Sequence, residues 1–265
     1  MIRVCMVGTG YVGLVSGACM ADFGHHVTCV DINQKRIDGL LNGEIPFYEP
    51  GLDRLVLKNV KEERLFFTNK LSEGMVDADI IMIAVQTPMS ESGEADLQYV
   101  MNVGKEIGEL MTSYKVIVTK STVPVGTARN LQKVIEAAQT TPVPFDLASN
   151  PEFLREGSSI EDFMRPDRVV IGVETEKSEE LLREIYRPLF LLDTPIVKTG
   201  IETAELIKYA SNSFLAVKIS FINEMARLAE KVGADISDVA KSMGLDKRIG
   251  PKFLHAGLGF GGSCL

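Results

Sequence analysis

Short apolar runs alternate with longer amphipathic stretches through residues 1–200. Several runs are continuously apolar, as is typical of parallel strands that are buried on both faces. We predict strands over Ile2–Val7, His26–Val30, Leu65–Thr68, Ile80–Val85, Val116–Lys120, Phe145–Ala148 and Val169–Val173. Helical periodicity predicts helices over Tyr11–Phe23, Gln34–Asn42, Leu97–Ser113, Thr127–Ala138 and Ser178–Phe190. This alternation favours an α/β fold with a doubly wound parallel sheet.

The pattern changes after Gly200. A helical pattern without Gly or Pro runs from Ile201 to Val232, which is near the upper length of a globular helix. A short helix is predicted over Ile236–Met243, with Asp235 as its N-cap and Gly244 as its C-terminal stop. The predicted organisation is therefore a sheet domain, 1–200, followed by a long central helix and a small helical region, 201–265.

Composition and charge narrow the classes of partner. Hydrophobic residues make up 45% and charged residues 24% of the chain, which is ordinary for a globular protein. The formal net charge is −8 and there is no basic tract, so nucleic acid and anionic membrane are poor candidates for partners.

The apolar stretch 4–24 mimics a signal peptide or a membrane span. Because five glycines and Asp22 interrupt it, we interpret it as a strand, a turn and a helix.

The four cysteines are Cys5, Cys19, Cys29 and Cys264. Their spacing matches neither a metal site nor a disulfide framework. We therefore predict no metal ion and a reduced, cytoplasmic setting.

A glycine-rich motif, Gly8-Thr9-Gly10-Tyr11-Val12-Gly13, follows the first predicted strand and opens a helix. The next strand ends at Asp31, 23 positions after Gly8, near the spacing expected of a ribose-binding acid. The motif therefore predicts a Rossmann-like dinucleotide site in which the helix N-terminus binds the pyrophosphate. The Asp31 carboxylate would repel a 2′-phosphate, which favours NAD over NADP, and Arg36 nearby weakens that preference slightly.

Polar residues also stand where later strands end. Thr87 follows the fourth predicted strand, and Ser121 and Thr122 follow the fifth. Ligands of open parallel sheets bind beyond the carboxyl ends of the strands, so these side chains are candidates for the cofactor pocket. Ordinary turn and capping chemistry accounts for them equally well.

Taken together, these segments resemble the UDP-glucose/GDP-mannose dehydrogenase family. The segments that carry the resemblance are Gly8–Gly13, Glu49-Pro50-Gly51-Leu52, Ser121–Thr127, Asn150-Pro151-Glu152-Phe153-Leu154-Arg155-Glu156-Gly157 and Phe260–Cys264. The family oxidises nucleotide sugars twice at one carbon with NAD. Its members combine a dinucleotide domain, a long central helix used for dimerisation and a C-terminal nucleotide-binding domain.

The resemblance implies that Cys264 is the nucleophile. A thiolate that adds to the aldehyde gives a thiohemiacetal, which can lose a second hydride and become a thioester that water hydrolyses. Glycines around Cys264 let the backbone approach a bulky substrate. The other three cysteines lie in apolar strands or in the first helix and are expected to be packing residues.

Further catalytic roles are implied for residues that share a helical face or follow a strand. Lys208 and Asn212 are four positions apart on the long helix and match a pair that contacts substrate and stabilises the oxyanion. The resemblance ties Glu156 to thioester hydrolysis and to the cofactor site. It also gives Thr122 a part in positioning water, with Glu152 as the second acid. An ordinary charged surface is the alternative for these polar residues.

The resemblance gives two sets of binding residues. The cofactor set is Gly8, Gly10, Tyr11, Val12, Gly13, Asp31, Arg36, Thr87, Ser121, Thr122 and Glu156. The substrate set is Glu152, Phe153, Leu154, Arg155, Glu156, Lys208, Asn212, Phe253, Leu254, His255, Ala256, Gly257 and Gly261. Residues 248–254 look most like the enzymes that act on UDP-glucose and make UDP-glucuronate, whereas Phe260 with Leu265 also occurs among GDP-mannose relatives.

The sequence departs from the family in one respect. Members continue past the cysteine with Pro-Lys-Asp and a uridine-binding domain, so a polypeptide that ended at Leu265 is expected to bind NAD and to form a homodimer through helix 201–232, with little turnover. Two other interpretations stay open. One is a β-hydroxyacid dehydrogenase of the 6-phosphogluconate type, and the other is a non-catalytic, NAD-binding dimeric fragment. Phe214, Ile219, Phe221 and Ile222 can pack in a dimer or on the parent domain.

Overall fold

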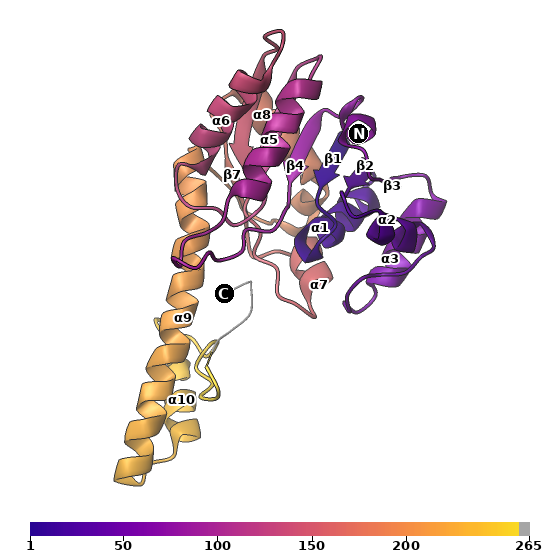
Figure 1. Ribbon diagram of the computed structural model, residues 1–265. Coiled ribbons are helices and arrows are strands. Elements are labelled where there is room, and N and C mark those ends of the chain that lie inside the picture. Colours follow the sequence, from indigo (N-terminus) through magenta and orange to yellow (C-terminus); the bar gives the residue numbers. More distant parts are fainter. Residues whose placement is uncertain (260–265) are drawn as a thin grey trace. The chain divides into compact units, whose positions relative to one another are not determined.

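The computed structural model describes residues 1–259, and the chain divides into two compact units, Met1–Leu206 and Ile207–Leu265. The first unit holds an eight-stranded sheet (Figure 1). Its strands are β1 (Arg3–Val7), β2 (His26–Val30), β3 (Leu65–Thr68), β4 (Ile80–Ile83), β5 (Lys115–Thr119), β6 (Phe145–Ser149), β7 (Val169–Gly172) and β8 (Ile196–Thr199). Its helices are α1 (Tyr11–Asp22), α2 (Gln34–Leu41), α3 (Leu52–Lys61), α4 (Leu71–Met75), α5 (Gln98–Leu110), α6 (Thr127–Ala138), α7 (Ser159–Met164), α8 (Glu176–Ile185), the 3-10 helix η1 (Arg187–Leu192) and the start of α9 (Ile201–Val232).

The strand order is β3-β2-β1-β4-β5-β6-β7-β8, and the pairs from β3 to β6 are all parallel. This is the order of a Rossmann sheet, whose direction of winding reverses between β1 and β4. The predicted α/β fold with a doubly wound sheet is therefore confirmed. One departure lies at the far end: β7 meets β6 antiparallel through the single pair Ser149↔Gly172, and β8 then runs parallel to β7.

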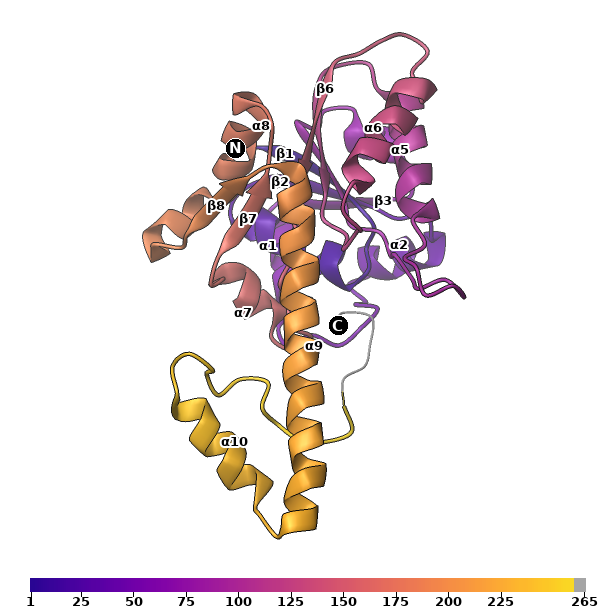
Figure 2. The same ribbon diagram turned by 90° about the vertical axis from the view of Figure 1, so that its left-hand side faces the viewer.

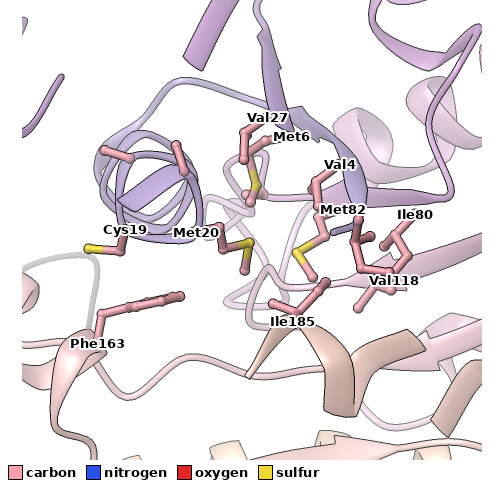
Figure 3. Close-up of a cluster of buried hydrophobic side chains, with 14 of the residues drawn as sticks. Val4, Met6, Cys19, Met20, Val27, Ile80, Met82, Val118, Phe163 and Ile185 are labelled. Carbon is pink, nitrogen blue, oxygen red and sulfur yellow. The ribbon is translucent and has the colours of Figure 1, made fainter. Parts of the chain in front are cut away.

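Two apolar cores cover the two faces of the sheet, with α5 and α6 on one side and α1, α7 and α8 on the other (Figure 2). Alternate residues along each strand supply the two cores, because successive side chains of a strand point to opposite faces. In β1, Val4 and Met6 face one core while Cys5 and Val7 face the other. In the first core, Met20 of α1 and Met82 of β4 point toward Ile185 of α8 (Figure 3).

Most of the predicted elements of the first unit are confirmed within one to three residues, and the stretch 4–24 forms a strand and a helix. The region predicted as one helix over Ser178–Phe190 instead forms α8, which begins at Glu176, and the separate 3-10 helix η1 with Pro188 at its start. Proline has no N–H to donate, so the α-helix cannot continue through this position. Four elements were not predicted, namely α3, α4, α7 and β8.

The second unit holds most of α9 and the helix α10 (Ile236–Leu245). The predicted bounds of α9 are confirmed, and so is the N-cap Asp235, whose carboxylate accepts the N–H groups of Ser237 and Asp238. The prediction that Gly244 ends the second helix is wrong. Gly244 lies inside α10, where a Cβ would approach Pro251 Cα to 2.8 Å, so this glycine serves a close contact and not a helix stop. No helix within residues 1–259 combines the length and the apolar character needed to cross a membrane.

Candidate active site

The motif Gly8–Gly13 forms the turn between β1 and α1. Gly8 has φ +103°, and a Cβ there would lie 2.6 Å from the carbonyl oxygen of Ala84. A Cβ at Gly13 would lie 2.0 Å from the carbonyl oxygen of Gly8, because helix α1 approaches the turn closely at this point. A Cβ at Gly10, by contrast, would meet no atom within 4 Å. The first and third glycines are thus required by packing, while the second faces open space at the start of a helix.

The N-terminus of α1 has the features of a phosphate site. Its N-cap is Gly10, which has no side chain to accept the first N–H groups of the helix, and its first turn contains no acidic residue. The N-terminus of α6 differs, because the Glu205 carboxylate accepts the N–H groups of Gly126 at 2.7 Å and Ala128 at 2.9 Å. An anion is stabilised where N–H groups at a helix start lack an acceptor. The backbone of Tyr11 and Val12 therefore fits a dinucleotide pyrophosphate, whereas α6 already holds a carboxylate.

Asp31 stands directly after β2 beside this turn. Its Oδ2 accepts the N–H of Thr9 at 2.9 Å and the hydroxyl of Thr9 at 2.7 Å, and Arg36 Nη1 lies 3.1 Å away. Burial alone would raise the pKa of Asp31, but the N–H of Asn33, both groups of Thr9 and the Arg36 charge outweigh it and lower the pKa. The carboxylate is therefore held ionised and fixed in place. Within the described residues Oδ1 accepts the N–H of Asn33, and a carboxylate oxygen can take a second donor, such as a ribose hydroxyl.

The loops after β4 and β5 are joined by side-chain hydroxyls. Thr87 Oγ1 donates to the carbonyl oxygen of Thr122 at 2.9 Å, and Ser121 Oγ donates to the carbonyl oxygen of Val85 at 2.5 Å. Both hydroxyls thus donate to backbone carbonyl groups, as expected if these residues serve to stabilise turns. The same bonds also fix the relative positions of the two loops at the carboxyl edge of the sheet.

A buried lysine orders the segment that follows β6. Lys120, which is 2% exposed, donates from Nζ to Asn150 Oδ1 at 3.0 Å and lies 3.4 Å from the hydroxyl of Tyr186. Asn150 in turn donates to the carbonyl oxygen of Val170 at 2.8 Å. These contacts hold the start of the 150–157 segment against the core, so Glu152 directly after it is held in place.

The candidate substrate residues of this segment lie in different surroundings. Glu152 is buried and accepts the N–H of Leu154 at 2.6 Å, whereas Glu156 is exposed. The ring of Phe153 lies under the guanidinium of Arg168, 3.6 Å from it. Arg155 pairs with Asp162, with Nη2 to Oδ1 at 2.5 Å. Of these candidates, Glu152 is thus the buried acid and Arg155 is engaged in an ion pair within the segment.

The remaining candidates belong to the second unit. Lys208 is buried and Asn212 is half-buried on α9. Farther along α9, Asn223 Oδ1 accepts the N–H of Gly257 at 2.9 Å. Leu254 is buried, His255, Ala256 and Gly257 are exposed, and Phe253 has φ +63°.

A cavity of about 320 Å³ lies inside the second unit. Part of the 253–257 segment forms one wall and α10 the other. The lining residues are Ile236, Ser237, Ala240, Lys241, Pro251, Leu254, His255 and Ala256. Gly261 and Cys264 lie outside the described residues.

The three described cysteines are not candidates for the nucleophile. Cys5, Cys19 and Cys29 have no solvent exposure. Burial raises the pKa of all three thiols, that of Cys29 to about 12. A buried thiol with a raised pKa holds no thiolate near neutral pH, so the expectation that these cysteines are packing residues is confirmed. Among residues 1–259 there is no cluster of three or more His, Cys, Asp or Glu side chains suited to a metal ion.

Sequence analysis missed two residues of the site. Thr9, the second residue of the motif, donates hydrogen bonds from both its N–H and its hydroxyl to Asp31. The signal available in the sequence was a hydroxyl residue between two glycines of the motif. Such a side chain can reach an acid that follows the second strand. Glu49 was noted only within a segment that carries the family resemblance and was given no role, yet it is 5% exposed and contacts both α1 and the residue after Glu156. Its contacts are 38 or more positions away in the sequence, so no local pattern reveals them.

Known proteins resemble this chain along its whole length. UDP-glucose 6-dehydrogenase TuaD of Bacillus subtilis is 54% identical over 264 residues, an alignment that covers 100% of this chain and 57% of that protein. The chain thus spans little more than half the length of that relative. The solved structure of a UDP-glucose dehydrogenase from Pyrobaculum islandicum superposes with a TM-score of 0.95 at 41% identity, covering 100% of this chain and 61% of the other. A ternary complex of GDP-mannose dehydrogenase from Pseudomonas aeruginosa gives a TM-score of 0.89 at 36% identity, with 100% and 62% covered.

Two family models match consecutive parts of the chain. The NAD binding domain of the UDP-glucose/GDP-mannose dehydrogenase family matches residues 2–190, and the central domain of the same family matches residues 202–265. The first match covers the dinucleotide turn and Asp31, whose geometry fits a pyrophosphate and a ribose. The cofactor predicted from the motif, NAD, is therefore confirmed. This chain belongs to the UDP-glucose/GDP-mannose dehydrogenase family, of which it carries the NAD-binding and central domains.

Proposed function

We propose that this protein oxidises carbon 6 of UDP-glucose to the acid, giving UDP-glucuronate, with NAD as the oxidant. The observation that carries the proposal is the uncapped start of α1 beside the fixed Asp31, in a chain that is 54% identical to a protein named UDP-glucose 6-dehydrogenase. GDP-mannose is the second candidate substrate, because a GDP-mannose dehydrogenase is among the similar solved structures.

Each of the two oxidations would transfer one hydride to a bound NAD, so two molecules of NAD would be reduced in turn. The backbone N–H groups at the start of α1 hold the pyrophosphate of the cofactor, and Asp31 holds a ribose. Arg36 beside Asp31 screens part of the carboxylate charge. Thr87, Ser121 and Thr122 border the same carboxyl edge of the sheet, where the nicotinamide end of a dinucleotide is expected.

The protein's own residues carry the steps between the two oxidations. The first oxidation removes a hydride from carbon 6 and a proton from its hydroxyl, which gives an aldehyde. The thiolate of Cys264 then adds to the aldehyde carbon, and the Lys208 ammonium and the Asn212 amide donate hydrogen bonds to the oxyanion that forms. Loss of the second hydride leaves a thioester.

Hydrolysis of the thioester completes the reaction. Water adds to the thioester carbon, and the carbon–sulfur bond breaks to return the thiolate and release the carboxylate. We assign the orientation of this water to Thr122 and to the acids Glu152 and Glu156. Glu152 is the buried member of the pair and Glu156 is the exposed one.

We further propose that two copies associate through α9. Exposed apolar side chains recur along this helix at spacings of three, four and seven residues, which place them on one side: Phe214 is exposed by 64%, Val217 by 60%, Phe221 by 44% and Leu228 by 51%. A helix stripe of this kind is the pattern of a helix–helix seam. Of the residues considered from sequence, Ile222 is buried within the chain and is not part of this stripe.

The test has two stages. Binding of NAD to this chain is measured first by calorimetry, and no binding would refute the proposal. Formation of NADH from NAD and UDP-glucose is then measured on the complete gene product, with GDP-mannose as the competing substrate. We expect two NADH for each UDP-glucose and no acid product from Cys264→Ala. Acid production by Cys264→Ala would instead favour a β-hydroxyacid dehydrogenase type of chemistry, which needs no thiol.

A further inference from the structure

Glu49 is a buried carboxylate that joins two segments of the proposed site. It lies in the loop between α2 and α3 and is 5% exposed. Its Oε2 accepts a hydrogen bond from the hydroxyl of Tyr11, the first residue of α1. The same oxygen accepts the N–H of Gly157 at 2.8 Å, and Oε1 accepts the N–H of Ser159 at 2.9 Å. One side chain thus contacts the dinucleotide turn and the end of the segment that carries Glu152 and Glu156.

The contacts form a closed arrangement. The N–H of Gly157 lies 2.9 Å from the hydroxyl oxygen of Tyr11 as well as 2.8 Å from Glu49. The ring of Tyr11 packs against Phe47, with ring centroids 4.9 Å apart. Gly157 has φ +85°, a conformation that glycine adopts without strain and that turns its N–H toward the carboxylate. The geometry therefore depends on Glu49, Tyr11 and Gly157 together.

The charge of Glu49 strengthens these bonds. Burial alone would raise the pKa of the carboxyl, but the bonds from Tyr11, Gly157 and the 159–160 turn outweigh it and lower the pKa. Burial and the bond to Glu49 together raise the pKa of the Tyr11 hydroxyl, so this group stays a donor. Hydrogen bonds to an ionised acceptor are about twice as strong as neutral ones, and a buried charge that loses its donors is costly.

We infer that Glu49 is a positioning residue, which holds segment 152–160 on the first turn of α1 and so sets Glu152 and Glu156 relative to the bound cofactor. This inference rests on the proposed function. Glu49 acts through Tyr11 and Gly157, because its own carboxylate is enclosed by the protein. A consequence is energetic coupling: NAD that orders the first turn of α1 also orders residues 157–160.

Amide hydrogen exchange of this chain with and without NAD tests the coupling. We expect NAD to slow exchange in 152–160 in the wild type. In Glu49→Gln, exchange at Gly157 and Ser159 should be at least about tenfold faster, as the loss of an ionised acceptor predicts, and NAD should no longer slow it. Unchanged exchange in β1 and β4 would show that the variant is folded.

Two further variants sharpen the result. Tyr11→Phe removes only one donor and should give a smaller effect in the same direction. Glu161→Gln is the matched control, because Glu161 is an exposed acid on α7 that pairs one turn away with Arg165, and it should behave as the wild type. The inference is overturned if NAD slows exchange in 152–160 equally in Glu49→Gln and in the wild type. It is also overturned if NAD leaves this segment unaffected in the wild type.

Turnover separates this inference from the proposed function. In the complete gene product, we expect Glu49→Gln to lower kcat at least about tenfold while changing the KM for UDP-glucose little, and Glu161→Gln to change neither. If the wild type forms no NADH from any nucleotide sugar, the proposed function fails while the exchange experiment still decides the positioning role. An active wild type with an equally active Glu49→Gln overturns the inference alone.

Discussion

Asp31 is fixed by neighbours that lie on both sides of it in space. Thr9 from the dinucleotide turn and Arg36 from α2 converge on Oδ2 of Asp31, and Oδ1 accepts the N–H of Asn33. In the proposed function, this carboxylate would contribute both a contact to a ribose hydroxyl and a charge that opposes a 2′-phosphate. These two effects are separable by a substitution that keeps the shape and removes the charge.

For Asp31→Asn we expect NAD to bind about tenfold more weakly, since a hydrogen bond to a charged group contributes roughly 1.5–3 kcal/mol, and NADP to bind more tightly. The reason is that the repulsion disappears while the Arg36 guanidinium remains to meet a phosphate. Titration of both cofactors by fluorescence measures the ratio of the two dissociation constants. Asp38→Asn, on the exposed side of α2, is the control. An unchanged ratio would contradict the role given to Asp31.

The burial of three cysteines predicts how the protein reacts with a thiol reagent. Because Cys5, Cys19 and Cys29 are fully buried, a thiol reagent should modify one cysteine quickly in the native protein and four after unfolding. We expect the fast site to be Cys264, the proposed nucleophile, and mass spectrometry of the labelled peptides identifies it. Fast labelling of Cys5, Cys19 or Cys29 would mean that the core opens readily.

The residue scale also shows where sequence reasoning succeeds. Gly8 and Gly13 belong to a motif that is recognisable from sequence, and packing requires glycine at both positions: a Cβ at Gly8 would lie 2.6 Å from the carbonyl oxygen of Ala84, and one at Gly13 would lie 2.0 Å from that of Gly8. Glu49 behaves differently. Its partners come from two distant segments, so its importance depends on the fold and not on its neighbours in sequence.

At the scale of elements, Glu205 links α9 to α6 by capping the N-terminus of α6. Burial raises the pKa of this carboxyl, and the two N–H groups offset only part of that rise. A folded-state pKa above the ordinary 4.5 means that the folded protein holds the proton more tightly than the unfolded chain. The contribution of Glu205 to stability is thus fully present below pH 4.5 and is lost as pH rises through the folded-state pKa.

We therefore expect the stability of the wild type, relative to Glu205→Gln, to fall as pH rises above 4.5. Glu202 on the same helix supplies the opposite case, because its bond to Arg129 lowers its pKa. The wild type should gain stability relative to Glu202→Gln as pH rises from acid values toward 4.5. Urea unfolding at a series of pH values measures both trends, and slopes of the same sign for the two variants would refute this account.

The elements that escaped prediction were short or half-exposed. Helices α4 and α7 span five and six residues, which is too few to establish a helical period. Strand β8 is an edge strand whose residues are exposed or half-buried, so it lacks the continuous apolar run that marked the other strands. Helix α3 is different, since Leu52, Leu55 and Val56 have helical spacing, and this short apolar pattern was not assigned to a helix.

At the scale of the whole molecule, the proposed association of two copies would depend on the exposed stripe of α9. We expect Phe221→Asp to convert a dimer into a monomer, because a carboxylate in an apolar helix seam would lose its water. Light scattering across a concentration series measures the mass. Ser220→Asp is the control, since Ser220 is exposed on the same helix next to Phe221. A monomeric wild type, or a dimer that survives Phe221→Asp, would contradict the proposal.

The junction between β6 and β7 has a consequence for behaviour in the cold. Within the described residues, one ladder pair and the bond from the Asn150 amide to the carbonyl oxygen of Val170 join the last two strands to β6, so their position depends largely on the packing of residues such as Val169 and Ile171 in the first core. The stabilisation gained by burying apolar side chains decreases on cooling. The stabilisation from backbone hydrogen bonds does not decrease in the same way. Near the freezing point of water, the β7–β8 region should therefore be the first part of the sheet to loosen, while the strands around the cofactor turn stay intact.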